Sequence, residues 1–209
     1  MINVDGVIVG NYRTSMSGND LNRRYLEPDS RLHPEVWSIK QLISDLIYGK
    51  TPDPGEEMAV PDGPQIQDED IMAYVDMHGH SRKKNVFIYG PQFPLSSDKY
   101  YRTRIIPKLL SEETEKFRYH SCQFKYEHEK RKTARIVLSK EFNIMNCYTL
   151  EASFHSHFDS LRNNYEFKHT CFEEMGENLI NSLYEYTLIT EEEQRLKQLK
   201  EMEKKKRKK

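Results

Sequence analysis

The sequence contains no apolar run that approaches the about 18 residues required to span a bilayer. Its first residues also lack the basic start and apolar core of a secretory signal peptide. Cysteine is scarce, and the three present, Cys122, Cys147 and Cys171, form an odd and widely spaced set that does not suit a disulfide framework. We therefore expect a cytoplasmic protein that works in a reducing compartment and has no membrane partner.

An excess of charge of either sign is also lacking. Lysine and arginine number 32 against 33 acidic residues, a formal net charge of −1, so the composition predicts no nucleic-acid partner. The charges are nevertheless unevenly distributed. Residues 51–70 contain four prolines and seven acidic residues with no basic residue, and we interpret them as a solvated loop, with a regulatory acidic loop as the less favoured alternative. The last six residues, Lys204 to Lys209, are all basic; we expect a solvated terminus, with microtubule steering or a nuclear signal as alternatives.

Aromatic residues, at 11%, and regular apolar patterns indicate a folded chain. Helical spacing predicts helices over residues 34–48, 101–117 and 172–188, and a capping-box pattern, Thr190 to Glu193, predicts the start of a charged helix. Short apolar or β-branched runs predict strands over residues 7–9, 71–77, 86–89, 121–126, 134–138 and 147–154. This alternation predicts an α/β class with a mixed central sheet flanked by helices.

The string Asp76-Met77-His78-Gly79-His80 stands where a predicted strand ends. Binding sites of open α/β sheets gather at such ends, an imidazole can bind zinc there, and a nearby carboxylate can orient its second nitrogen. Hydrogen-bonded histidines are commoner than metal ligands, so the string alone leaves both interpretations open. The pair His155 and His157 is a weaker metal candidate.

Two further patterns indicate chemistry. Asn22, Arg23 and Arg24 place an amide beside two guanidinium groups, which can grip a carboxylate, although an ordinary surface turn has the same composition. Glu151 lies inside an apolar strand, where a carboxylate is costly to bury unless it is paired or reactive. It could be a general base, or it could lie on the wet face of an edge strand.

In combination these motifs make the chain resemble the zinc metallocarboxypeptidases, specifically the cytosolic carboxypeptidase branch that trims glutamates from tubulin. Five blocks match that branch in order, over about residues 3 to 188: residues 5–13 (DGVIVGNYR), 20–25 (DLNRRY), 76–90 (DMHGHSRKKNVFIYG), 121–137 with its Ser-Cys and Thr-Ala-Arg-Ile-Val, and 148–154 (YTLEASF). Residues 173–176 (EEMG) match its closing helix.

The resemblance implies a role for each motif residue. His78 would be a zinc ligand, and Arg13, Asn22 and Arg23 would hold the terminal carboxylate of the substrate, with Arg13 also polarising the scissile carbonyl. Glu151 would be the general base toward zinc-activated water. His80 and Ser81 would support the site. Arg135 is the candidate for recognising an acidic side chain, and the alternative is a strand cap or a contact with Glu127 or Glu129. The expected partners are acidic protein C-termini such as tubulin tails, with microtubule or cilium association.

The resemblance is incomplete in one respect. The family takes its first two zinc ligands from an upstream His-x-x-Glu motif that this sequence does not contain, and His33-Pro34-Glu35 is a poor substitute because it follows the Asn-Arg motif. We therefore expect an N-terminally truncated enzyme: residues 1–188 as the C-terminal portion of the catalytic domain, and 189–209 as a charged helical tail. A genuinely short, inactive relative is the alternative.

Three functions remain open at this stage. The first is a zinc carboxypeptidase for glutamate-rich C-termini. The second is a pseudo-enzyme that keeps the arginines and Asn22 as an anion pocket and binds acidic tails without cutting them. The third is an unrelated metallohydrolase that uses His78 and His80, but the surrounding blocks do not supply its other ligands.

Overall fold

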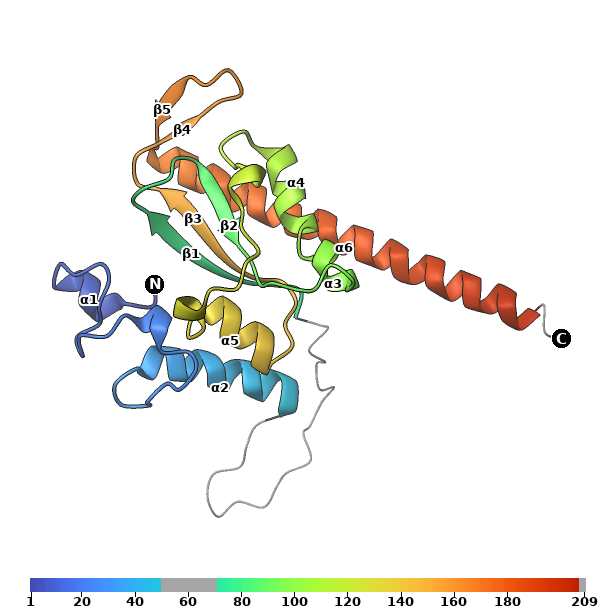
Figure 1. The fold of residues 1–209 in the computed structure, drawn as a ribbon, viewed down its shortest axis with the longest axis horizontal. Coiled ribbons are helices and arrows are strands. Elements are labelled where there is room, and N and C mark those ends of the chain that lie inside the picture. Colours follow the sequence, from blue (N-terminus) through green and yellow to red (C-terminus); the bar gives the residue numbers. More distant parts are fainter. Residues whose placement is uncertain (50–70, 207–209) are drawn as a thin grey trace, which may run out of the picture. The chain divides into compact units, whose positions relative to one another are not determined.

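The computed structural model describes residues 1–49 and 71–206, so the predicted acidic loop at 51–70 and the last three basic residues lie outside it. The helices and strands appear in Figure 1. The helices are α1 (Val4–Ile8), α2 (Pro34–Tyr48), α3 (Asp98–Arg102), α4 (Ile105–Glu113), α5 (Ala134–Glu141) and α6 (His169–Lys206). The strands are β1 (Tyr74–His80), β2 (Val86–Tyr89), β3 (Cys147–Ser153), β4 (Ser156–Phe158) and β5 (Asn164–Glu166).

The central sheet is mixed and small, with strand order β1-β3-β2. β1 and β3 run parallel, because the Tyr74 N–H donates to the Asn146 carbonyl near the start of both strands (2.9 Å) and the Phe154 N–H donates to the His80 carbonyl at their ends (3.0 Å). β4 and β5 form a separate antiparallel hairpin in which His157 lies opposite Tyr165. The predicted α/β class with a mixed sheet is confirmed.

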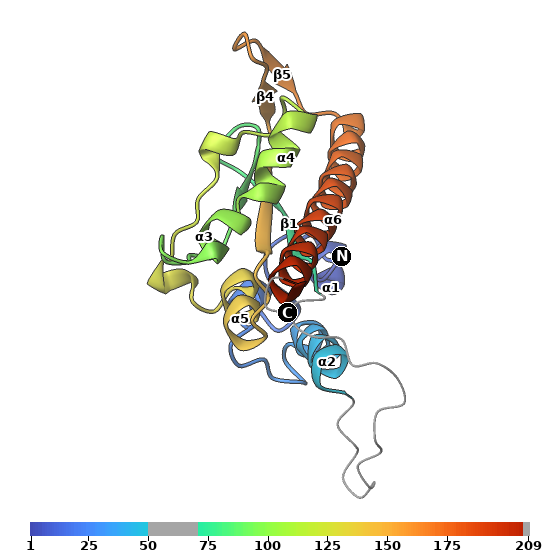
Figure 2. The same ribbon diagram turned by 90° about the vertical axis from the view of Figure 1, so that its right-hand side faces the viewer.

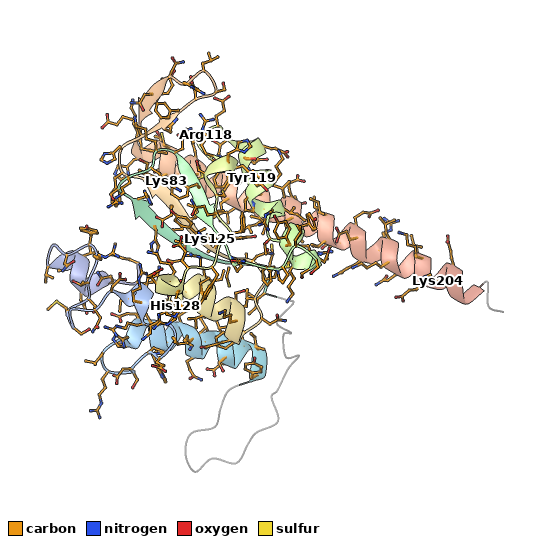
Figure 3. The ribbon with its side chains drawn as sticks, in the orientation of Figure 1. Lys83, Arg118, Tyr119, Lys125, His128 and Lys204 are labelled. Atoms are coloured by element: carbon orange, nitrogen blue, oxygen red, sulfur yellow. The ribbon has the colours of Figure 1, made fainter. Side chains whose placement is uncertain are left out.

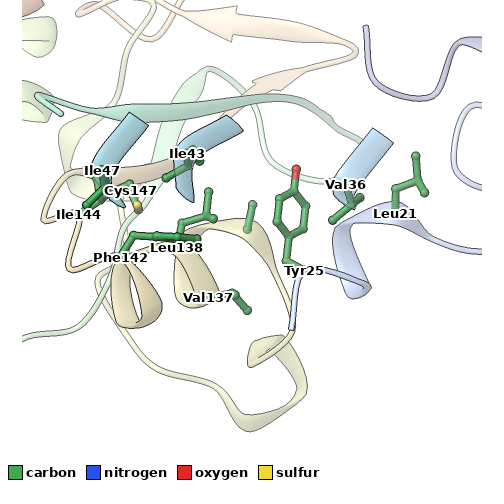
Figure 4. Close-up of a cluster of buried hydrophobic side chains, with 11 residues drawn as sticks. Leu21, Tyr25, Val36, Ile43, Ile47, Val137, Leu138, Phe142, Ile144 and Cys147 are labelled. Atoms are coloured by element: carbon green, nitrogen blue, oxygen red, sulfur yellow. The ribbon is translucent and has the colours of Figure 1, made fainter. Parts of the chain in front are cut away.

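The chain divides into two compact units, the first made of residues 1–77, 89–94 and 123–150. Its core packs α2 against α5 and the residues around them (Figure 4). Pro34 begins α2 without losing a hydrogen bond, and the apolar stripe of that helix buries Val36, Ile43 and Ile47. From α5 and the segment after it come Ala134, Val137, Leu138, Phe142, Ile144 and Cys147.

The second unit consists of residues 78–88, 95–122 and 151–209. In it α4 packs against α6, and both views show the two helices side by side (Figure 2). Ile106 and Leu110 of α4 are fully buried, as Met175 and Leu179 of α6 nearly are. Lys116 pairs with Glu174 at the edge of this unit. No helix within residues 1–49 and 71–206 is both long and apolar enough to cross a membrane.

Several predicted elements are confirmed. The helix over residues 34–48 and the strand over 86–89 have the predicted bounds, and the strand over 147–154 ends one residue early. The strand predicted over 71–77 begins later, at Tyr74, and continues to His80. The strand is only partly buried, because Asp76 is the one buried residue in it.

Three predicted strands are wrong. Residues 7–9 lie in and after the short, exposed helix α1, because a β-branched run forms a strand only where another strand pairs with it. Residues 134–138 belong to helix α5; all five are buried, and an apolar run buried on every side has no period that separates helix from strand. Ser121 ends a 3-10 helix that begins at Tyr119, and residues 122–126 are irregular apart from one bridge between Gln123 and Tyr89.

Two predicted helices have different limits. The helix predicted over residues 101–117 is two helices, α3 and α4. The helix predicted over 172–188 continues without a break to Lys206, so Thr190 does not cap a new helix; its hydroxyl donates to the Thr187 carbonyl one turn earlier (2.8 Å). Residue 188 therefore lies inside a helix, and a functional division at that point stays a prediction.

Leu138→Ala tests the core of the first unit. Leu138 is 0% exposed in that cluster, and we expect its truncation to lower the free energy of unfolding by about 2–5 kcal/mol, through lost burial and the cavity that remains. Urea unfolding followed by circular dichroism measures the change. Leu42→Ala on α2 is the matched control, because Leu42 is 60% exposed and should change stability by less than about 1 kcal/mol. Equal losses for the two variants would contradict this assignment of the core.

Candidate functional site

The side chain of Asn22 is tied to two distant segments of the first unit. Its Nδ2 donates to Asp76 Oδ2 in β1 (3.2 Å), and its Oδ1 accepts from the backbone N–H of Ala134 at the start of α5 (3.0 Å). The backbone N–H of Asn22 in turn donates to Asp20 Oδ1 (3.0 Å), which caps the short 3-10 helix Leu21–Arg23. The loop that carries Asn22 is therefore held at a defined place on the core.

Arg13 and Arg23 belong to the same assembly. Arg13 Nη2 lies 3.0 Å from Asp20 Oδ2, the carboxylate that also caps Asn22. Asn11 Oδ1 accepts from the backbone N–H of Arg13 (3.0 Å) and so fixes the backbone there. Arg23 Nη1 donates to the Asn22 carbonyl (2.8 Å), which uses one of the five donors of a guanidinium. An amide and two guanidinium groups thus occupy one loop, and such groups together suit a carboxylate ligand.

Arg135 follows Ala134 in α5 and is only 6% exposed. Its guanidinium lies over the ring of Tyr89, 5.3 Å from the ring centre, in a cation–π contact. A buried guanidinium has lost much of its hydration, so its attraction for an anion is stronger than at an exposed site. The strand cap that was the alternative role is wrong, because Arg135 lies in a helix. Its recognition of an acidic side chain stays a prediction.

Two tyrosines lie next to this assembly. The hydroxyls of Tyr25 and Tyr74 are 3.1 Å apart, and burial raises the pKa of Tyr25 to about 12, with the charge of Asp76 adding to the effect. Burial and the nearby Tyr25 also raise the pKa of Tyr74. Both hydroxyls therefore stay protonated over the ordinary pH range. The bond between them links Tyr25, in the helix-rich core, to Tyr74 at the start of β1.

The second unit contains His78 in β1 and Glu151 in β3. Glu151 is half-buried, as is His78. The adjacent His80 accepts at Nδ1 from the backbone N–H groups of Arg82 (3.1 Å) and Lys83 (3.0 Å). Burial and these two cations lower the pKa of His80, so its neutral form with an acceptor Nδ1 is favoured. This arrangement is compatible with the predicted supporting role of His80.

The resemblance implies zinc, which needs several protein donors around His78. A catalytic zinc site generally takes three protein ligands. Within the part of the chain that the structure describes, no three histidine, cysteine, aspartate or glutamate side chains gather where they could hold a metal ion. The described residues therefore do not fit a complete zinc site around His78.

The structure thus brings Arg13, Asn22, Arg23 and Arg135 into one unit, and it places His78 and Glu151 on strands of the other. The sequence did not predict that Asp20 and Asp76 bond to Asn22, although each carboxylate stands in one of the motifs. Asp76 was considered as a partner of a metal-ligating histidine, and in the structure it accepts a hydrogen bond from Asn22. A carboxylate is a natural acceptor for an amide that must be oriented, which is the signal that could have found it.

Sequence comparison relates the chain to a named group of proteins. It is 38% identical to cytosolic carboxypeptidase 1 of Danio rerio over 73% of the chain, 35% identical to cytosolic carboxypeptidase 3 of Bos taurus over 98%, and 36% identical to cytosolic carboxypeptidase 2 of Homo sapiens over 74%. The alignments cover 13%, 19% and 15% of those proteins, so the chain spans less than a fifth of their length. No family model matches.

Solved structures with the same fold are bacterial metallocarboxypeptidases. The enzyme of Burkholderia cenocepacia superposes with a TM-score of 0.67 at 18% identity, over 90% of this chain and 43% of that one. The enzyme of Pseudomonas aeruginosa, solved with (2-guanidinoethylmercapto)succinic acid, gives 0.62 at 20% identity, over 91% and 44%. The predicted carboxypeptidase-like fold is confirmed.

Tyr25→Phe tests the buried tyrosine pair. A raised folded-state pKa means that the unfolded chain ionises first, so this stabilisation is complete below pH 10 and is lost as pH rises toward about 12. We expect the free energy of unfolding of the unsubstituted protein, measured in urea, to fall over that range, with Tyr25 contributing up to roughly 2–3 kcal/mol of the fall. Tyr25→Phe should reduce this dependence, since burial still raises the pKa of Tyr74, and Tyr184→Phe, which changes an exposed ring, should retain it in full. An unchanged pH slope in Tyr25→Phe would contradict the assignment.

Asn22→Asp tests the link between the loop and β1. The variant replaces an amide donor by a carboxylate facing Asp76, so at pH 7 we expect a loss of about 1–3 kcal/mol in unfolding free energy. Lowering the pH protonates one of the two carboxyls and should restore part of the loss. Asn19→Asp, in the same loop, is the control and should show no comparable recovery. A variant as stable as the parent at pH 7 would contradict the link.

Proposed function

Because this chain is a relative of the cytosolic carboxypeptidases and has a metallocarboxypeptidase fold, we propose that it provides the substrate-carboxylate site and the general base of a carboxypeptidase that removes C-terminal residues from proteins. The observation that carries the proposal is the fixed assembly of Asn22 with its arginines. Acidic tails, such as the glutamate-rich C-terminus of tubulin, are the proposed substrates. The names of the relatives favour the cytoplasm as its location.

The terminal carboxylate of a substrate needs donors that are already oriented. Asn22 is oriented by Asp76 and Ala134, and Arg23 is placed by its bond to the Asn22 carbonyl. Because this order exists before a ligand arrives, binding does not incur the entropy cost of ordering the loop. Charge-assisted hydrogen bonds from a guanidinium would then select a chain end, since an internal peptide carries no such carboxylate.

Two further residues complete the proposal. Glu151, on β3, would take the proton of the attacking water and return it to the leaving amine, as a general base and then a general acid. Arg135, buried over Tyr89, would pair with an acidic side chain and so favour glutamate. Zinc would supply Lewis-acid activation of the water in an enzyme of this kind, but it requires ligands beyond those that the described residues assemble.

A second function, binding of acidic tails without cleavage, is favoured by the metal ligands that the described residues do not supply. Within residues 1–49 and 71–206 the groups proposed to bind a carboxylate are held in place, whereas no set of metal ligands gathers. A chain of this kind would bind acidic C-terminal tails without cutting them. Both functions require Arg23, whereas only catalysis requires Glu151. The two functions can therefore be separated by experiment.

Arg23→Ala is the deciding variant. Peptides ending in glutamate, with either a free carboxylate or a C-terminal amide, are titrated against the full chain by fluorescence anisotropy. We expect the unsubstituted chain to prefer the free carboxylate by about 10- to 100-fold and Arg23→Ala to lose that preference, because a charge-assisted bond contributes about 1.5–3 kcal/mol. Arg24→Ala is the matched control, since Arg24 bonds to the Asn19 side chain in the same loop.

Mass spectrometry of the same peptides, incubated with zinc, separates the two functions. Loss of a terminal glutamate that Glu151→Gln abolishes supports the enzyme, and binding without loss supports the tail-binding module. Equal affinity for the free and amidated peptides would contradict both.

A further inference from the structure

A pocket of about 900 Å³ lies in the second unit, among the loop before β2, the segment after α4 and the turn of the β4–β5 hairpin. Four cationic residues line it, Lys83, Lys84, Arg118 and Arg162, and Figure 3 labels the first and third of them. Among the described residues that line it there is no aspartate or glutamate. None of the residues predicted for peptide cleavage lines this pocket either.

The wall of the pocket at Phe158 is rigidly fixed. Asn85, a buried residue with φ of 66°, donates from Nδ2 to the Phe158 carbonyl (2.9 Å) and accepts at Oδ1 from the Phe158 N–H (3.1 Å). Arg118 Nη2 donates to the carbonyls of Phe158 (2.9 Å) and Asp159 (2.7 Å). Both carbonyls are neutral, so these bonds hold the guanidinium in place without cancelling its charge.

Lys84 is oriented by neutral groups as well, and Lys83 lies over an aromatic ring. Lys84 Nζ lies 3.0 Å from Asn164 Oδ1 and 4.5 Å from the centre of the Phe158 ring, and Lys83 Nζ lies 4.4 Å from the centre of the Phe87 ring. The carboxylate of Asp159, in the hairpin turn, accepts hydrogen bonds from the backbone and side chain of Asn163 (both 2.8 Å). A second carboxylate, that of Glu115, accepts a hydrogen bond from the backbone N–H of Ser160 (3.3 Å), which lines the pocket. These two carboxylates therefore bond to backbone and amide donors of the hairpin turn.

We propose that this pocket binds a run of carboxylates in an acidic peptide segment. Its volume is near the upper end of the roughly 300–1,000 Å³ of ligand pockets, more than one carboxylate or phosphate needs, and its cations come from three segments, which suits several anionic groups in sequence. Single-stranded nucleic acid is less suitable, because it requires aromatic faces for base stacking and the ring of Phe158 already faces an ammonium. This inference stands on the second unit alone and does not depend on cleavage.

The test uses the full chain and a fluorescein-labelled oligoglutamate peptide with an amidated C-terminus, so that Asn22 and Arg23 meet no terminal carboxylate. Anisotropy titrations compare the parent with the double variant Lys84→Glu, Arg162→Glu; both positions are exposed, so the fold should tolerate the change. The matched control is Lys197→Glu, Lys200→Glu, which makes the same change in net charge on the exposed part of α6. Circular dichroism melting verifies that both variants are folded. An oligothymidylate of equal length is the second probe.

We expect the parent to bind the amidated peptide, the pocket variant to weaken binding by about tenfold or more, and the control to change it by less than about threefold. Equal weakening by the two double variants would overturn the proposal, since it would show only a general effect of net charge. Tighter binding of oligothymidylate than of peptide, lost in the pocket variant, would overturn it in favour of nucleic acid. Absence of peptide binding by the folded parent would overturn it outright.

Discussion

The side chain of Asn22 is the point on which the candidate site depends. One carboxamide joins its own loop to β1 through Asp76 and to the start of α5 through Ala134. Each bond satisfies a partly buried polar group that would otherwise lose its hydration without compensation. Arg13, through Asp20, and Arg23, through the Asn22 carbonyl, are positioned relative to this one residue. The positions of the groups proposed to bind a carboxylate thus depend on how this loop is anchored.

Cations held by neutral partners recur in both units. Arg23 bonds to a carbonyl in the first unit. In the second unit, Arg118 bonds to two carbonyls and Lys84 to an amide oxygen. A neutral partner restricts a cationic side chain while leaving its charge available, whereas an ion pair within the protein would cancel much of it. Such cations suit an acidic ligand, which is the chemistry proposed for each unit.

Prediction from the sequence succeeded where the pattern is local. The stripe of α2 and the apolar runs of β2 and β3 identify those elements, because a half-buried helix and a buried strand have different periods. It failed for α5, whose first five residues are all buried, and for Val7 to Val9, which have no neighbouring strand. In the site, motif order predicted Asn22 and the arginines as carboxylate-binding residues, and that role stays a prediction. Asp20 and Asp76 were not recognised as their anchors, because Asp76 is 54 residues away from Asn22 and the pairing is tertiary.

The sequence by itself determined the family resemblance, the α/β class and the residues capable of holding a carboxylate, since these follow from residue type and order along the chain. Only the tertiary structure decided which of those residues come together, how each is held and where further cations gather. The pocket formed by Lys83, Lys84, Arg118 and Arg162 has no signature along the chain, because its cations come from three segments that folding alone brings side by side. Hydrogen bonds between such segments depend on distances that no local pattern encodes.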